Sequence, residues 1–230
     1  MISSNLLIPI LWVFSLILPP VENTTINESP NNNSSLSFSL YEQLSVKTDV
    51  LPNKDVFALA MQGWEKLNTE LKSKVITIID FSLPSTEKRL WIIDPERKLV
   101  LLHSVVSHGR NSGNLIASKF SNKPESYQSS LGFYKTAETY HGKHGYSLRL
   151  DGLEKGFNDQ ARNRAIVIHG ADYAREEFAK SSGRLGRSLG CPALPTELSS
   201  KAIDFIKEGS LLFIYGQDES YLQSSNLIRS

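Results

Sequence analysis

Residues 75–106 read VITIIDFSLPSTEKRLWIIDPERKLVLLHSVV, and three apolar runs within this stretch decide the fold class. The runs cover residues 75–81, 89–94 and 98–106. Each is short, rich in β-branched and aliphatic side chains and bounded by turn residues, which is typical of β-strands. The second and third runs are joined by the sequence DPER at residues 94–97, where proline suits position i+1 of a type I turn. We therefore expect these two runs to form a β-hairpin.

Further apolar runs extend this pattern along the chain. More strand candidates lie at residues 131–138, 146–152, 165–170 and 211–215. Apolar side chains that recur with a period of 3.6 residues predict an amphipathic helix over residues 53–72. A second helix is expected over residues 196–209, with Thr196 as its N-cap and Gly209 as its stop. Because the helices lie at the two ends and the strands between them, we predict a mainly β fold, a β-sandwich with flanking helices.

The N-terminal region has the features of an exported protein. Residues 6–18, LLIPILWVFSLIL, form an uncharged apolar run that fits the core of a signal peptide and is shorter than the ~20 residues of a membrane-spanning helix. An uncleaved N-terminal anchor is the alternative, because residues 1–5 carry no Lys or Arg and no A-x-A cleavage site follows. We expect export to the periplasm or cell envelope.

The composition indicates a single folded domain with polar extensions. The chain is 40% hydrophobic and 21% charged, and its net charge of +1 gives no electrostatic reason to expect a nucleic-acid partner; the composition does not fix an oligomeric state. The predicted organisation is a signal peptide or anchor at 1–20, an Asn/Ser-rich linker at 21–50, the folded domain at 51–216 and a polar C-terminal tail at 217–230.

Cys191 is the only cysteine in the sequence. In an exported chain, a lone cysteine forms an intermolecular disulfide, stays a buried inert thiol or acts as a nucleophile. Cys191 lies between Gly190 and Pro192, outside any periodic apolar run, where backbone N–H groups of a tight turn could face a developing oxyanion. This position favours the nucleophile over the inert thiol.

A thiol nucleophile needs a base at neutral pH, because its free pKa of about 8.5 leaves only a few per cent as thiolate. Among the five histidines, His169 is the best placed, since it ends the apolar run 165–170 and precedes Cys191 by a loop long enough to fold back. A structural imidazole bonded to a loop carbonyl is the alternative for His169. The HxxH pair at His141 and His144 is a weak zinc pattern without a third ligand at a familiar interval, so we predict no metal.

The motifs around these two residues resemble a known family. IHGADY (168–173) followed by GRSLGCPALP (186–195) resembles the catalytic signature of the L,D-transpeptidase (YkuD-type) superfamily. DFSLPSTEKRLWIID, VSHGRNSG and YHGKHGYSLRLDGLEKGFN resemble its branch of murein L,D-transpeptidase catalytic domain proteins. The resemblance implies a YkuD-like β-sandwich, with Cys191 as the nucleophile, His169 as its base and no cofactor.

The resemblance also implies a reaction on peptidoglycan stem peptides. The thiolate would attack a tetrapeptide donor and expel its terminal D-alanine, and an amine of another stem would then accept the acyl group in a 3→3 crosslink. A β-lactam such as a carbapenem is expected to acylate the same thiol. Two alternatives stay open: an L,D-carboxypeptidase or endopeptidase that hydrolyses the acyl-enzyme, and a non-catalytic wall-binding module.

Further residues of these motifs are candidates for the site. Gly190 and Cys191 are expected to supply oxyanion N–H groups, and Ser188 to orient the loop. The candidate substrate-binding residues are Arg187, Tyr146, Gly170, His108 and Asn111. For Arg187 the alternative is a solvated surface charge, for Tyr146 packing at a hairpin rim, and for His108 and Asn111 a glycine-rich turn. The chain departs from the commoner Ser-His-Gly-Cys pattern at Leu189, which cannot titrate.

Overall fold

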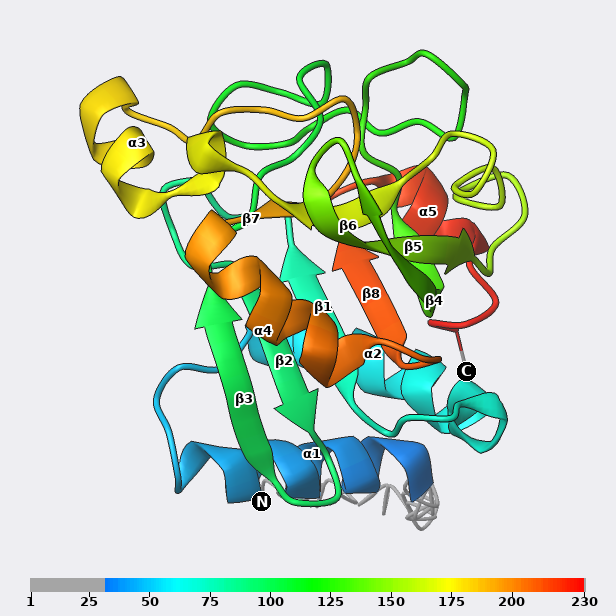
Figure 1. Ribbon diagram of the computed structural model, residues 1–230. Coiled ribbons are helices and arrows are strands. Elements are labelled where there is room, and N and C mark those ends of the chain that lie inside the picture. Colours follow the sequence, from blue (N-terminus) through cyan, green and yellow to red (C-terminus); the bar gives the residue numbers. More distant parts are fainter. Residues whose placement is uncertain (1–31, 230) are drawn as a thin grey trace, which may run out of the picture. The chain divides into compact units, whose positions relative to one another are not determined.

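The computed structural model describes residues 32–229, which are built around one eight-stranded mixed sheet (Figure 1). The strands follow the order β3-β2-β1-β8-β4-β5-β6-β7 across the sheet. Their bounds are β1 Ile76–Asp80, β2 Leu90–Asp94, β3 Leu99–Ser104, β4 Gly132–Gly142, β5 Gly145–Gly152, β6 Val167–Gly170, β7 Ala193–Leu194 and β8 Leu211–Tyr215. The predicted mainly β fold is confirmed, and each predicted strand has a counterpart in the sheet.

The expected hairpin is formed by β2 and β3, which pair antiparallel. Its turn closes through the side chain of Asp94, whose Oδ1 accepts the backbone N–H of Arg97 at 2.9 Å. The neighbouring strand β1 is buried along its whole length between β2, which is antiparallel to it, and β8, which is parallel. A strand buried on both faces reads as a continuous apolar run, which is the pattern of residues 75–81.

The two edges of the sheet approach each other and nearly close it. Beyond the end of β3, the backbone N–H of Ser107 donates to the carbonyl of Ala193 in β7 at 2.8 Å. The N–H of Ser188 donates to the carbonyl of His108 at 2.9 Å, and the N–H of Arg110 returns to the carbonyl of Ser188 at 2.8 Å. The segment 105–110 and the segment 186–194 therefore form a closing seam, which leaves few unpaired edge groups.

Helices cover the sheet on both faces. Figure 1 shows α4 (Thr196–Ile206) in front of the sheet, where it contacts β5 and β6, and α2 (Lys54–Leu67) behind it, against β1 and β8. The helix predicted over residues 53–72 ends earlier, and the short helix η1 (Asn68–Glu70) follows it. Thr196 is not the side-chain cap predicted for α4, because its hydroxyl donates to Asp172 of the short helix η2 (Asp172–Ala174) at 3.1 Å.

The linker predicted over residues 21–50 is helical in its second half. Residues 32–45 form α1 (Asn32–Ser45), which packs on α2. Leu40 and Leu44 are one turn apart and are both buried, so this Ser-rich helix still presents an apolar edge to the domain. The predicted signal peptide or anchor and residues 21–31 lie outside the described part of the chain.

The predicted polar tail is also structured. α5 (Glu219–Ser224) places Tyr221 in the core, where its hydroxyl donates to the buried carboxyl of Glu154 at 3.0 Å. Ser225 and the backbone N–H of Phe133 donate to the same carboxyl group, which ties the C-terminal segment to the loop after β5. No helix within residues 32–229 is long and apolar enough to cross a membrane.

Candidate active site

Cys191 lies on the loop that joins α3 (Glu176–Ser182) to β7, at the seam of the sheet. Gly190 before it adopts φ +128°, a region that residues with a side chain rarely occupy. A Cβ at Gly190 would also lie 2.9 Å from the carbonyl oxygen of Gln128. Glycine is therefore required to bring the loop this close to its neighbour and to set the direction of Cys191.

Ser188 fixes the loop that carries Cys191 through two hydrogen bonds. Its hydroxyl donates to the carbonyl of Cys191 at 2.6 Å and accepts the backbone N–H of Gly190 at 3.0 Å. The hydroxyl of Ser129 donates to the carbonyl of Gly190 at 3.2 Å. The N–H of Gly190, which was expected to be an oxyanion donor, is thus occupied by Ser188 in this structure.

The backbone N–H of Cys191 is the remaining candidate for an oxyanion donor. Within residues 32–229 no acceptor takes this N–H, whereas the N–H and the carbonyl of Gly190 are both bonded. An unpaired backbone N–H beside a thiol is the kind of donor that an oxyanion hole uses.

The thiol of Cys191 is turned toward the start of β6. Its Sγ accepts the backbone N–H of Val167 at 3.4 Å and donates to the carbonyl of Ala165 at 3.7 Å. Burial raises the pKa of the thiol above its ordinary value, although the Val167 N–H and the charge of Arg164 oppose this rise. The group therefore rests as a neutral thiol.

His169 stands on β6, the strand next to β7. Its Nδ1 lies 2.9 Å from the carbonyl oxygen of Gly170. Because a carbonyl only accepts, Nδ1 carries the proton and Nε2 keeps a basic lone pair. His169 is 2% exposed, and burial lowers its pKa; the Gly170 carbonyl opposes this effect and the charge of His144 adds to it.

Cys191 and His169 lie on neighbouring segments, but their side chains are not hydrogen-bonded to each other. His169 pairs with Ala193 in the parallel register of β6 and β7, so Cys191 lies two residues before the partner of His169. The thiol hydrogen-bonds to Val167 and Ala165 and makes no hydrogen bond to the imidazole. In the resting structure the two side chains therefore lie on adjacent segments, with no hydrogen bond between them.

His108 does not line a cleft in this structure. The ring is fully buried, its Nδ1 accepts from Arg89 at 2.8 Å, and its Nε2 donates to the carbonyl of Gly113 at 3.3 Å. Burial and the charge of Arg89 lower the pKa of His108 to about 4. The prediction that it binds substrate is corrected: both nitrogens are used inside the domain, next to the closing seam.

The other predicted residues have different surroundings. Arg187 is half-buried, and its Nη1 donates to the carbonyls of Arg110 and Gly113, so it holds that loop. Asn111 is exposed, and its side-chain amide donates to the carbonyl of Ser126 at 2.9 Å. Gly170 accepts from His169 and lies against α4, where a Cβ would be 2.6 Å from the hydroxyl of Ser199.

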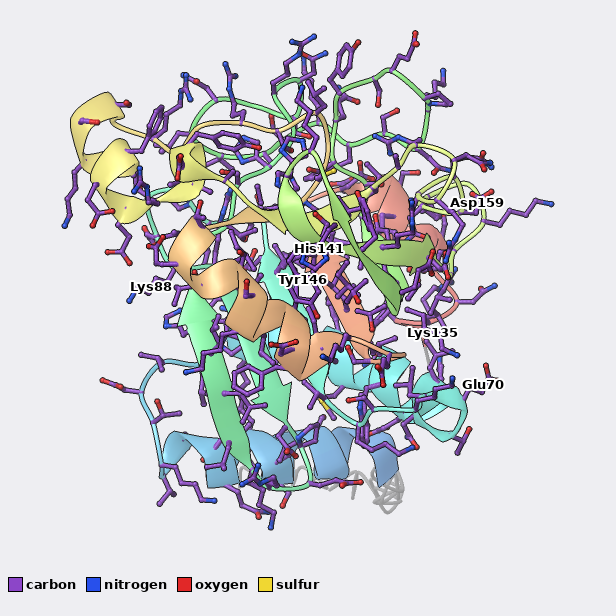
Figure 2. All side chains as sticks on the ribbon, viewed as in Figure 1. Glu70, Lys88, Lys135, His141, Tyr146 and Asp159 are labelled. Carbon is purple, nitrogen blue, oxygen red and sulfur yellow. The ribbon has the colours of Figure 1, made fainter. Side chains whose placement is uncertain are left out.

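Tyr146 lies on the β4–β5 hairpin and turns toward α4. Its hydroxyl donates to Asp204 at 3.1 Å, and its ring stacks on His141 with the ring centroids 5.2 Å apart; Figure 2 shows the two rings side by side. His144, at the tip of the same hairpin, stacks on His169 at 4.4 Å. The two histidines of the HxxH pair thus have separate partners. Among residues 32–229, no group of three His, Cys, Asp or Glu side chains could hold a metal.

The sequence did not reveal two neighbours of the pair, Arg164 and His144. Arg164 precedes β6 and reaches the residue before Cys191, where a Cβ on Gly190 would lie 3.2 Å from its Nη2. His144 reaches His169 only because β5 lies between β4 and β6 in the sheet. An arginine near a strand and a histidine in a turn carry no signal of their own in a single sequence.

Comparison with known proteins points to one family. A family model described as L,D-transpeptidase catalytic domain matches residues 49–215. Solved structures to which the chain is similar include an L,D-transpeptidase from Mycobacterium smegmatis, at 14% identity and a TM-score of 0.38, with 62% of this chain and 58% of that chain covered. The LD transpeptidase LdtMt1 in complex with imipenem gives 13% identity and a TM-score of 0.38, with 61% and 58% covered.

An L,D-transpeptidase from Stackebrandtia nassauensis is similar over more of its length, at 14% identity and a TM-score of 0.38, with 81% of this chain and 91% of that chain covered. The chain thus spans less than two thirds of the first two structures and most of the third. No curated protein matches the sequence. These structural similarities are distant, so the family assignment depends on the match over residues 49–215.

Proposed function

Because this chain belongs to the L,D-transpeptidase catalytic domain family, we propose that it is a cysteine acyltransferase acting on the stem peptides of peptidoglycan. The observation that carries the proposal is the arrangement at the seam. Cys191 presents an unpaired backbone N–H, and its thiol lies one segment from the basic Nε2 of His169. Nucleophile, base and oxyanion donor are the three groups that acyl transfer requires.

Acylation begins from the neutral pair. The thiol turns away from Val167 toward His169, and Nε2 takes its proton as the sulfur forms a bond to the carbonyl carbon of the donor peptide. The carbonyl oxygen becomes an oxyanion that accepts the N–H of Cys191. When the intermediate collapses, the C–N bond to the terminal D-alanine breaks, and the imidazolium returns its proton to the departing amine.

Deacylation repeats these steps with a new nucleophile. The amine of a second stem peptide attacks the thioester carbon and loses its proton to Nε2, and the sulfur leaves and recovers that proton. The product is the proposed 3→3 crosslink. The same thioester is hydrolysed when water enters instead, which makes tripeptide the product of the alternative carboxypeptidase reaction.

The proposed location agrees with the proposed substrate. Peptidoglycan lies outside the cytoplasm, and the apolar run at residues 6–18 supports export to the periplasm or cell envelope. Cell fractionation with an antibody to the chain tests this placement, and recovery from the cytosol alone would contradict it.

The direct test is incubation of the purified protein with a disaccharide-tetrapeptide and mass analysis of the products. We expect a crosslinked dimer with loss of D-alanine for the wild type and no product for Cys191→Ala. Tripeptide alone would support the hydrolase, and equal product from Cys191→Ala would overturn the nucleophile assignment. Substrate retained without any product would support a wall-binding module.

A β-lactam probe tests the thiol independently of the acceptor. One similar structure is an L,D-transpeptidase in complex with imipenem, so we use imipenem as the reagent. Intact mass is expected to show one covalent adduct on the wild type and none on Cys191→Ala, which has no nucleophile at that position. An adduct on both proteins would mean that another residue is acylated.

A further inference from the structure

Arg164 is a half-buried cation that has no acidic partner. None of the ion pairs between side chains of residues 37–229 includes Arg164, and its hydrogen-bond acceptors are all neutral oxygens. Arg162, two residues earlier, is exposed and pairs with both Glu138 and Asp151. Burying a charge without a counter-ion is costly, so the position of Arg164 requires an explanation.

The donors of Arg164 clamp the segment 121–130. Nη1 donates to the carbonyl of Ser121 at 2.7 Å and to the hydroxyl of Ser130 at 3.1 Å. Nη2 donates to the carbonyl of Gln128 at 2.6 Å and to the hydroxyl of Ser126 at 3.3 Å. These four bonds use the four hydrogens of the two terminal nitrogens, so the guanidinium cannot also grip a substrate carboxylate with both.

The charge of Arg164 faces the nucleophile loop. Its Nη2 lies 3.2 Å from the place of a Cβ on Gly190, and the carbonyl of Gln128 that it binds lies 2.9 Å from the same point. Cys191 is the next residue, and the charge of Arg164 lowers the pKa of its thiol against the larger effect of burial. The cation thus acts on Cys191 through space and not through a bond.

We propose that Arg164 is a positioning residue for the nucleophile: its charge stabilises the negative states that form at Cys191, while its donors hold residues 121–130 against Gly190. The inference rests on the proposed function of Cys191. Two negative groups form there in sequence, the thiolate and then the oxyanion of the intermediate, and both lie in a partly buried place where a nearby charge is screened less than in water. The negative charge that forms at Cys191 is thus the counter-charge that Arg164 lacks in the resting state.

The test measures the thiol and not the turnover. The rate of iodoacetamide alkylation is followed from pH 6 to 11 by intact mass for the wild type, R164Q and R164K, with R162Q as the matched control. An opposite charge close to an acid lowers its pKa by about one unit or more, so R164Q is expected to contain about tenfold less thiolate at pH 7. R164K keeps the charge and is expected to stay within about threefold of the wild type.

The control separates this effect from a general change of charge, because R162Q removes an exposed arginine from the same turn and is expected to leave the profile unchanged. A folded R164Q with the wild-type profile would overturn the proposal, as would an R164K profile displaced as far as that of R164Q. If R164Q does not fold, R164K alone decides: a tenfold loss of thiolate would refute the role of charge. The titration uses no peptidoglycan, so its result can be interpreted even if the protein proves inactive on stem peptides.

Discussion

Replacement of Gly190 by alanine tests whether the loop that carries Cys191 depends on the conformation of this residue. At φ +128° an alanine is strained by about 1 to 3 kcal/mol. Its Cβ would also lie 2.9 Å from the carbonyl of Gln128 and 3.2 Å from Arg164, closer than ordinary contacts, and overpacking of this kind costs about 1 to 3 kcal/mol. We therefore expect Gly190→Ala to lower the free energy of unfolding by about 3 kcal/mol in total.

Gly156→Ala is the matched control, because Gly156 also has a positive φ, +86°, but nothing lies within 4 Å of the place of its Cβ. It should show the backbone strain alone, about 1.5 kcal/mol. Both variants are unfolded with urea and followed by tryptophan fluorescence, and their imipenem acylation rates are compared. Acylation is expected to fall only for Gly190→Ala, which displaces Cys191. Equal stability losses and unchanged acylation in both variants would refute the reasoning.

Three further predictions follow from the buried titratable groups. His169→Ala should lower imipenem acylation by about 10²- to 10⁴-fold, the range for loss of a general base, and an unchanged rate would exclude His169 from that role. His144→Ala removes the ring that stacks on His169 and the charge that lowers its pKa, so NMR titration should show the pKa of His169 moving up toward 6.5. A pKa below that of the wild type would contradict this prediction. Burial raises the pKa of Glu154 in the folded state, so the stability that this carboxyl contributes is complete below pH 4.5 and is lost as the pH rises through the folded-state pKa. The free energy of unfolding of Glu154→Gln, measured with urea at several pH values, should lack this decrease. If the decrease is unchanged in Glu154→Gln, it comes from another group.

Local signals made much of the fold predictable. The hairpin of β2 and β3 could be predicted because its two strands and its turn are contiguous in the sequence. β7 was not predicted, because it has two residues and exists only through its pairing with β6 and Ser107. α1 was not predicted either, because the high Ser and Asn content of this segment is typical of a linker. Only the burial of Leu40 and Leu44 shows that it packs as a helix.

The candidate site was also predictable only where local motifs carry the information. The residue types of Cys191 and His169 and the motifs around them suggested a family. The match over residues 49–215 confirms that family. The catalytic roles of the two residues stay predictions. His108 was misplaced because a histidine followed by glycine looks like an exposed turn, whereas the chain continues inward from β3 and meets the buried Arg89. Burial of a single loop residue depends on the tertiary path of the chain, which no local pattern records.

The closing seam explains why a buried arginine and a buried histidine lie near the candidate nucleophile. Arg89 donates to the carbonyl of Val106 and to His108, so it fixes the segment 105–110 from the inside. That segment in turn bonds to Ser188 and Ala193, on either side of Cys191. The same hydrogen bonds that close the sheet therefore hold the loop that carries Cys191, and a site built on a rigid sheet edge is positioned more precisely than one on a free loop. Leu189 is 59% exposed, so the departure from the commoner motif lies on the surface, directly before Gly190 and Cys191.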